Sequence, residues 1–185
     1  MALTLNGSNN TIAGLAVGGL PDGIVDTDML AATAVTRAKT NLPGSILQIV
    51  SSHTCSSVAS TSQTWADTGL TANITPSSTS SKILVVALLN GCHTASSGNI
   101  NQLQLQLLKD STVIDVFATE AGHSDGHLNH MDIGTGGAVT HLNSPNTTSQ
   151  VTFKVQFRKR LDITKTVTVQ YASSCSYITL YEVAG

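Results

Sequence analysis

The chain has 185 residues and a formal net charge of −2, a length that suits one ordinary domain with an appendage. Because 9 basic residues face 11 acidic ones, a broad basic field for non-specific nucleic-acid binding is excluded as the main function. Only 11% of the residues are charged, whereas 21 Ser and 25 Thr supply many small hydroxyls, and a hydrophobic share of 41% still permits a core. This composition predicts an all-β protein.

The first 44 residues form a segment of their own. Residues 1–44 contain no aromatic side chain, whereas all seven aromatic residues lie between Trp65 and Tyr181. The stretch Asp26–Lys39 predicts one short helix, with acidic residues in its first turn and basic residues in its last. Nothing bulky in the segment can cover its small apolar side chains, so it is expected to pack against other chains. We therefore predict two parts, 1–44 and 45–185.

Targeting signals and membrane spans are not expected. The N-terminus has neither a basic region nor a long apolar stretch, so it does not predict a secretory signal. No apolar run approaches the ~20 residues that a membrane-spanning helix needs. We therefore expect no membrane insertion.

From residue 45 onward, apolar and polar residues alternate with a period of two, which is typical of strands with one solvated face. The alternation is clearest in the ranges 102–107, 151–158 and 166–171. Further strands are predicted at Ile46–Ser51, Leu70–Thr75, Lys82–Leu89, Val113–Thr119, Gly137–Leu142 and Ser176–Val183. The continuous apolar run after Lys82 indicates either a central strand or a subunit interface. Eight or nine short strands separated by turns predict an antiparallel β-sandwich of the jelly-roll type.

The three cysteines, Cys55, Cys92 and Cys175, are widely spaced and form no CxxC motif. An odd number at such spacing indicates neither a zinc site nor a disulfide framework. Since no signal sequence is expected, three small, buried, reduced thiols are predicted, with a single disulfide as the alternative.

One stretch collects side chains that can bind metal, and its members are His123, Asp125, His127, His130 and Asp132. Three imidazoles are a suitable ligand set for zinc or iron, within one chain or across a threefold axis. On a strand, however, His130 would face away from the other two imidazoles, and the Gly and Asn content predicts a loop. We therefore predict an exposed polar loop with no metal site.

The same stretch matches the pattern GxSxG, with Ser124 in the position of a nucleophile. A nucleophile elbow needs a strand leading in and a helix leading out, and the residues after Ser124 are poor helix formers. Neither HExxH nor GxxxxGK[ST] occurs in the sequence. We expect no catalytic residue, no cofactor and no enzymatic activity.

Five of the nine basic residues fall within Lys154–Lys165, and Arg158–Arg160 predicts a solvated hairpin tip. Contact with an anionic host-surface glycan is the alternative, whereas RNA binding is disfavoured because no aromatic stacking platform accompanies the charges. The single tryptophan, Trp65, is expected to pack in the core or in an interface rather than to stack on a sugar.

Two stretches near the N-terminus, Gly18–Ala31 and Ala34–Lys39, resemble the N-terminal regions of bacteriophage tail-fibre proteins, especially those of cyanophages and marine phages. The later stretches 43–48, 68–85, 142–148, 153–158 and 178–183 resemble the C-terminal β-domain of the same group. The resemblance implies a virion structural protein that attaches through its N-terminus, usually as a homotrimer. This chain departs from the longer fibres because no shaft repeats separate its two parts.

These observations together predict a non-enzymatic short tail fibre, made in the host cytoplasm and carried on the virion. Residues 1–44 are expected to bind tail, baseplate or portal-adaptor proteins, and residues 45–185 to face the receptor, with a host-surface glycan as one candidate ligand. A head fibre or capsid cement protein and a β-sandwich carbohydrate-binding module are the alternatives.

Overall fold

The computed structural model describes residues 4–6, 11–13, 42–94, 101–121, 123–124, 135–161 and 165–185. The chain divides into two compact units, Met1–Asn41 and Leu42–Gly185. In the first unit, strands β1 (Thr4–Asn6) and β2 (Thr11–Ala13) pair antiparallel. The helix expected within Asp26–Lys39 lies outside the described residues.

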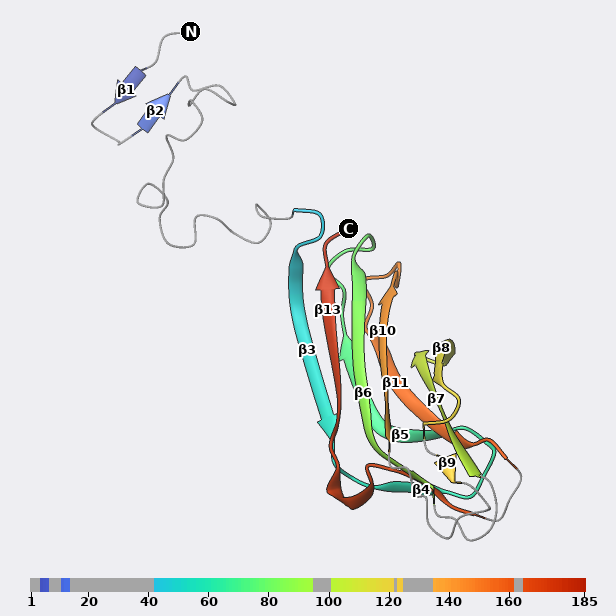
Figure 1. Ribbon diagram of the computed structural model, residues 1–185. Helices are drawn as coiled ribbons and strands as arrows, with labels where there is room; N and C mark the ends of the chain where they lie inside the picture. The colour runs from blue at the N-terminus through green and yellow to red at the C-terminus, as the bar shows by residue number, and fades with distance from the viewer. Residues whose placement is uncertain are drawn as a thin grey trace. The chain divides into compact units, whose positions relative to one another are not determined.

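The second unit is a sandwich of two antiparallel sheets (Figure 1). The first sheet contains β3 (Ile46–Thr54), β4 (Val58–Ser60), β6 (Lys82–Thr94), β10 (Thr135–Asn143), β12 (Val167–Val169) and β13 (Ser176–Val183). The second sheet contains β5 (Ala66–Ile74), β7 (Asn101–Lys109), β8 (Thr112–Ala118), β9 (His123–Ser124) and β11 (Val151–Lys159).

The order of the long strands defines the topology. Four of them pair in the order β3–β13–β6–β10, and the other four in the order β5–β11–β7–β8. Counted along the chain, the first sheet therefore holds the first, eighth, third and sixth long strands, and the second sheet holds the second, seventh, fourth and fifth. This arrangement is that of a jelly roll, so the predicted antiparallel sandwich of that type is confirmed.

The strands predicted from the period-two pattern are all present, with shifted ends. The range Ser176–Val183 is the same in the structure, whereas β6 continues beyond Leu89 to Thr94. The run after Lys82 is a central strand, since β6 pairs with β13 on one side and β10 on the other. Strands β4 and β9 were not predicted because three and two residues are too few to show a period.

The core lies between the sheets and consists of the inward side chains of the alternating strands. Phe153 and Phe157 on β11 are its largest members and are fully buried. Aliphatic side chains surround them, among them Ile83, Val85, Leu89, Leu103, Leu105, Leu107, Ile178 and Leu180. Burying one such large side chain contributes about 1.5–3 kcal/mol, so this interleaved set is the main stabilising element of the sandwich.

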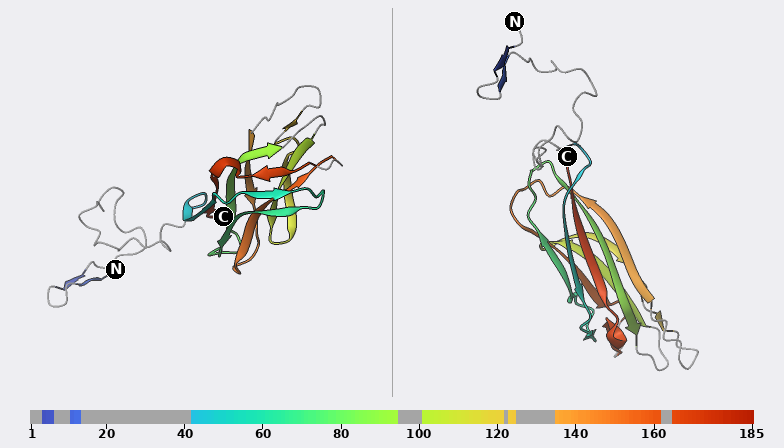
Figure 2. Two further views of the ribbon diagram at one scale, coloured as in Figure 1. Left: turned by 90° about the horizontal axis from the view of Figure 1, so that it is seen from below. Right: turned by 90° about the vertical axis from the view of Figure 1, so that its left-hand side faces the viewer.

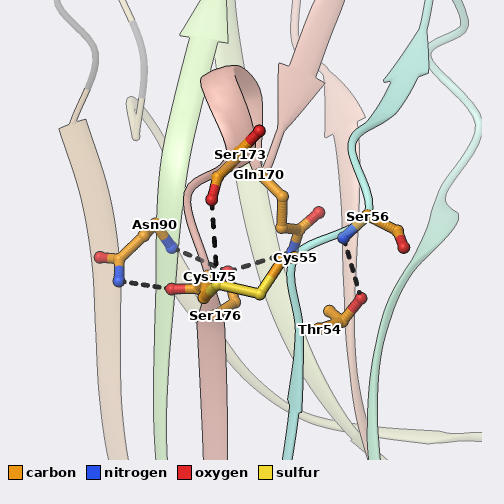
Figure 3. The surroundings of a disulfide bond; sticks show 8 residues. All are labelled: Thr54, Cys55, Ser56, Asn90, Gln170, Ser173, Cys175 and Ser176. Atoms are coloured by element: carbon orange, nitrogen blue, oxygen red, sulfur yellow. Dashed lines mark hydrogen bonds between the residues drawn. A yellow bond between two sulfur atoms is a disulfide. The ribbon is translucent and has the colours of Figure 1, made fainter.

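In the first sheet, the pairing of β3 with β13 ends before the pairing of β4 with β12 begins. A disulfide lies at this interruption between the two ladders (Figure 3). The ladder between β3 and β13 ends with the pair Thr54 and Ser176. Cys55, which follows β3, and Cys175, which precedes β13, are therefore neighbours. They form a disulfide with a Cα–Cα distance of 4.1 Å. The expectation of three reduced thiols is therefore wrong for these two. Sheet register brings together residues 120 positions apart, which spacing along the chain cannot reveal.

The third cysteine, Cys92, is free and buried, as expected. Desolvation raises the pKa of its thiol to about 12. Because the reactive form of cysteine is the thiolate, Cys92 is a chemically inert part of the core.

Strand β6 passes the interruption in close contact with the short 3-10 turn η3 (Tyr171–Ser173). Asn90 donates from its backbone to Ser176 Oγ at 3.0 Å and from Nδ2 to the Cys175 carbonyl at 2.8 Å (Figure 3). The following residue, Gly91, has φ +62, and a Cβ there would lie 2.6 Å from the backbone nitrogen of Tyr171. Glycine is therefore required where β6 meets the turn.

A buried carboxylate holds together the end of the sandwich where the chain enters. Glu182 on β13 is fully buried and accepts hydrogen bonds from Ser77 N at 2.7 Å, Ser77 Oγ at 2.6 Å and Gln48 Nε2. Burial raises the pKa of this carboxyl, but the hydrogen bonds outweigh that effect and leave the pKa below its ordinary value. Glu182 thereby joins β3 and the loop after β5 to the last strand.

Candidate functional site

The two outer faces of the sandwich differ in chemistry, and the face of the second sheet is polar. Side chains of β5, β7 and β11 that point away from the core form this polar face, and they are Asp67, Gln102, Gln104, Gln106, Lys154, Gln156 and Arg158. Cross-strand register places Gln106 opposite Gln156 and Gln104 opposite Arg158. The face is therefore a set of interlocking amide and charged groups rather than independent solvated side chains.

Asp67 anchors one side of the polar face. Its carboxylate accepts from Gln156 Nε2 at 2.7 Å and lies 3.0 Å from Lys154 Nζ. Gln156 in turn accepts from Gln106 Nε2 at 2.7 Å, so one continuous network crosses three strands. Desolvation acts to raise the pKa of Asp67, but the hydrogen bonds from Gln156 and Lys154 and the lysine charge leave it lowered. The carboxylate is thus ionised and committed to this network at neutral pH.

Trp65 lies next to this network, beneath a guanidinium group. The Cζ atom of Arg158 is 4.5 Å from the centre of the Trp65 ring, and Arg158 Nε donates to Gln104 Oε1 at 2.8 Å. Trp65 is half-buried and does not belong to the core cluster, so the core alternative is wrong for this residue, whereas the interface alternative stays a prediction. A cation–π pair with a hydrogen-bonded arginine holds the indole at the surface instead.

A second cationic group, Arg160, extends the polar network past the end of β11. Its Nη1 donates to Gln102 Oε1 at 2.7 Å and to Glu120 Oε1 at 2.9 Å, and Gln102 Nε2 donates to Glu120 at 2.9 Å. The segment around Arg160 is not the predicted hairpin tip, because β11 and β12 lie in different sheets. Jelly-roll topology makes this connection cross from one sheet to the other, which a local pattern does not show.

The contact between Arg158 and Trp65 yields a prediction. Replacing Arg158 with Leu is expected to make the single tryptophan more accessible to acrylamide, because the guanidinium no longer covers the ring. The loss of the cation–π contact and one hydrogen bond should lower the free energy of unfolding by about 1 kcal/mol. Lys154→Met removes the ion pair with Asp67 but should leave quenching unchanged. Equal quenching in both variants would contradict the observed stacking.

The outer face of the first sheet has the opposite character. Its six strands contain only two residues of the types Asp, Glu, Lys and Arg, namely the buried Glu182 and Lys82 at the start of β6. Twelve outward residues, three on each long strand, form what we call the apolar face: Ile49, Ser51, His53, Leu84, Val86, Leu88, Ala138, Thr140, Leu142, Tyr177, Thr179 and Tyr181. Several are exposed large apolar side chains, with Ile49 at 58% and Leu142 at 53%.

The histidine-rich stretch lies only partly within the described residues. His123 and Ser124 form β9 and pair with Gln102 and Asn101 of β7. Asp125, His127, His130 and Asp132 lie outside the described residues, so the absence of a metal site stays a prediction. The absence of a nucleophile at Ser124 stays a prediction as well. Within the described ranges, no three His, Cys, Asp or Glu side chains gather as a metal site.

Sequence reasoning missed the partners that organise the polar face. Glu120 and Gln104 carry no motif, and each contacts a residue about forty or more positions away in the chain. The alternation of Gln and Leu in β7 predicted a strand with one solvated face, and this prediction is wrong, because all residues from Asn101 to Leu108 are buried. The one available signal was the clustering of Arg and Lys in β11 beside a strand of unusual glutamine content.

Comparisons with known proteins add little beyond the fold class. The sequence matches no family model, and no curated protein matches it significantly. Among solved structures, the infectious bursal disease virus VP2 subviral particle aligns with a TM-score of 0.38 and 11% identity. Particles with T=1 symmetry derived from the same virus give 0.36 and 13%. The alignments cover 75% and 76% of this chain but only 37% of each viral chain.

Alignments as weak as these carry no information about the function of this chain. In the part of the chain that the structure describes, no helix is long and apolar enough to cross a membrane.

Proposed function

We propose that this protein is a virion structural protein, specifically a non-enzymatic short tail fibre of a bacteriophage. Residues 1–44 bind the particle, residues 45–185 face the host surface, and the molecule is a homotrimer. The resemblance of Gly18–Ala31 and of the later strand sequences to phage tail fibres supports the proposal. The two-unit division of the chain supports it as well.

The observation that supports the proposal most directly is that the two ends of the sandwich differ: both termini of the unit lie at one end. At one end, Gly44 N donates to Ala184 O at 2.8 Å and Ala184 N donates to Ser45 O at 2.9 Å, so the chain enters and leaves there. Strand β6 begins at this end, where Lys82 pairs with Val183, and runs to Thr94, so the opposite end holds the last residues of β6 and the first of β7. Figures 1 and 2 show the long strands running between these ends.

This difference between the two ends suits an adhesin that is anchored at one of them. A particle that holds the segment before residue 45 holds the sandwich by its entry end, and the opposite end projects. The polar face runs toward that projecting end, where Arg160 and Glu120 lie beside Gln102 at the start of β7. The exposed groups there are the Arg160 guanidinium and the Glu120 carboxylate, with side chains 43% and 51% exposed, and such groups bind sugar hydroxyls and anionic sugars. A host-surface glycan is therefore the ligand class that this face favours.

Deletion of residues 1–44 tests the proposal. We expect the truncated chain to be lost from purified virions, because the attachment segment is missing, while the sandwich keeps its β-sheet circular dichroism and cooperative melting. Its core lies entirely within residues 45–185, so the burial that offsets chain entropy is retained. The measurement is quantitative mass spectrometry of particles with and without tails.

Three outcomes would contradict the proposal. Full-length protein absent from purified virions would exclude a virion role. Detection in tailless heads would favour the alternative of a head fibre or cement protein. Normal incorporation of the truncated chain would show that residues 1–44 are not the attachment segment.

A further inference from the structure

We infer that the apolar face is the surface through which copies of this chain contact one another in the homotrimer. The inference rests on the proposed trimer and goes beyond it by assigning the contact to one side of one sheet. It follows from the register, exposure and charge of twelve residues on four strands.

Cross-strand register orders the apolar face into three rows. The first row contains Ile49, Tyr181, Leu84 and Leu142. The second row contains Ser51, Thr179, Val86 and Thr140. The third row contains His53, Tyr177, Leu88 and Ala138. Two rows of bulky aliphatic and aromatic side chains thus enclose a row that is mainly hydroxyl-bearing.

The side chains of this face do not belong to the core of their own sandwich. Ile83, Val85, Ala87 and Leu89 alternate with them on β6 and are fully or almost fully buried. The outward neighbours Val86 and Leu88 are 38% and 42% exposed, and Tyr177 on the adjacent strand is 50% exposed. A strand with one solvated face normally carries polar residues there, so apolar residues on both sides indicate a sheet covered on both faces.

The extent of the face fits one half of a protein–protein contact. With strands about 4.8 Å apart and alternate residues about 6.7 Å apart, four strands and three rows cover roughly 400 Å². A standard interface buries about 800 Å² per partner, so this face supplies a large part of a stable contact. The remainder is assigned to residues 1–44, whose sequence contains many small apolar residues and no aromatic one.

Charge identifies a second copy as the occupant. None of the twelve residues is Asp, Glu, Lys or Arg, so three copies that turn this face toward a common axis meet without like-charge repulsion, and the hydroxyl row supplies both donors and acceptors to the neighbouring copies. The two edge strands of the sheet, β3 and β10, also lack those four residue types and proline, the usual protections of an exposed edge. The charged groups lie on the polar face, which such an assembly leaves free for a ligand.

The stacking of His53 and Tyr177 adds order to this surface. Their ring centroids are 5.9 Å apart with an interplanar angle of 24°, so the two side chains are held in place before any partner arrives. A pre-ordered aromatic side chain loses less conformational entropy on association than a free one, which is typical of residues that contribute strongly to an interface.

The test places two negative charges on the face in the full-length protein. Val86→Glu with Leu88→Glu is expected to raise the trimer dissociation constant at least ~100-fold, because like charges then meet in a desolvated contact. The matched control is Thr71→Glu with Asn73→Glu, which puts the same charges at the same spacing on exposed positions of β5. Sedimentation equilibrium gives the dissociation constants, and circular dichroism verifies that both variants are folded.

An unchanged dissociation constant for the β6 variant would overturn the inference, as would a full-length wild-type protein that is monomeric at high concentration. Failure of this inference and failure of the proposed function are distinguishable, because the first is measured by the dissociation constant and the second by the presence of the protein in purified virions. A β6 variant that dissociates while the wild type is absent from particles would refute the fibre and support the interface. A β6 variant that stays trimeric while the wild type is present in particles would refute the interface and support the fibre.

Discussion

Replacement of Cys175 by Ser is expected to lower the free energy of unfolding by about 3–5 kcal/mol under oxidising conditions. The disulfide with Cys55 closes a loop with a sequence separation of 120, and in the chain-entropy account a cross-link of that span restricts the unfolded chain strongly. The bond also joins the segment between β3 and β4 to the segment between β12 and β13. Its loss should therefore loosen the contact between β12 and β4 first. Urea denaturation with and without a reducing agent measures the loss of stability, and amide hydrogen exchange of β4 and β12 measures the local loosening.

The double variant supplies the control for this prediction. Cys55→Ser, Cys175→Ser and the combination should be equally destabilised, because a cross-link can be lost only once. Wild-type protein with its disulfide reduced should unfold at a similar urea concentration to the three variants. Three free thiols in the oxidised wild-type protein, or additive effects of the two substitutions, would contradict the assigned bond.

Glu182 should produce the second large effect. Replacing it with Ala removes a buried carboxylate that accepts three hydrogen bonds from Ser77 and Gln48, so we expect a loss of about 3 kcal/mol. Glu182→Gln keeps the shape but turns an amide donor toward groups that are themselves donors, so a smaller loss of about 1–2 kcal/mol is expected. Urea denaturation at pH 7 measures both.

The same residue predicts how stability depends on pH. The folded-state pKa of Glu182 is lower than its ordinary value of 4.5, so its contribution is present above that value and is lost as the pH falls through the lowered pKa. Wild-type protein should therefore lose stability below about pH 5, and Glu182→Gln should show a weaker dependence there. Asp67→Asn is the control, because its exposed carboxylate should contribute less. Identical pH profiles for wild type and Glu182→Gln would exclude this role.

The sequence alone was sufficient to predict the fold class because the period-two pattern reflects burial directly. Every second residue of β11 is buried, and this alternation was legible over the whole of 151–158. The run after Lys82 predicted a central strand or a subunit interface for a similar reason, since both of its faces carry apolar residues, and β6 is a central strand.

Long-range register was not predictable in the same way. The Cys55–Cys175 bond and the contact of Arg160 with Glu120 depend on which strand ends come together, and no local pattern encodes that choice. Hydrophobic size made the core one of the two places predicted for Trp65, whereas a guanidinium 4.5 Å above the ring covers it outside the core. Sequence therefore predicted which residues face inward but not which residues meet.

The position of β13 has a consequence for how the chain reaches its native state. This last strand lies between β3, the first strand of the sandwich, and β6, so neither of those strands has its central neighbour until residues 176–183 are available. During synthesis the first sheet cannot close before residues 176–183 have left the ribosome, so β3 and β6 remain without β13 until then. Such non-local pairing makes folding slow, and any association of copies through this sheet has to follow it.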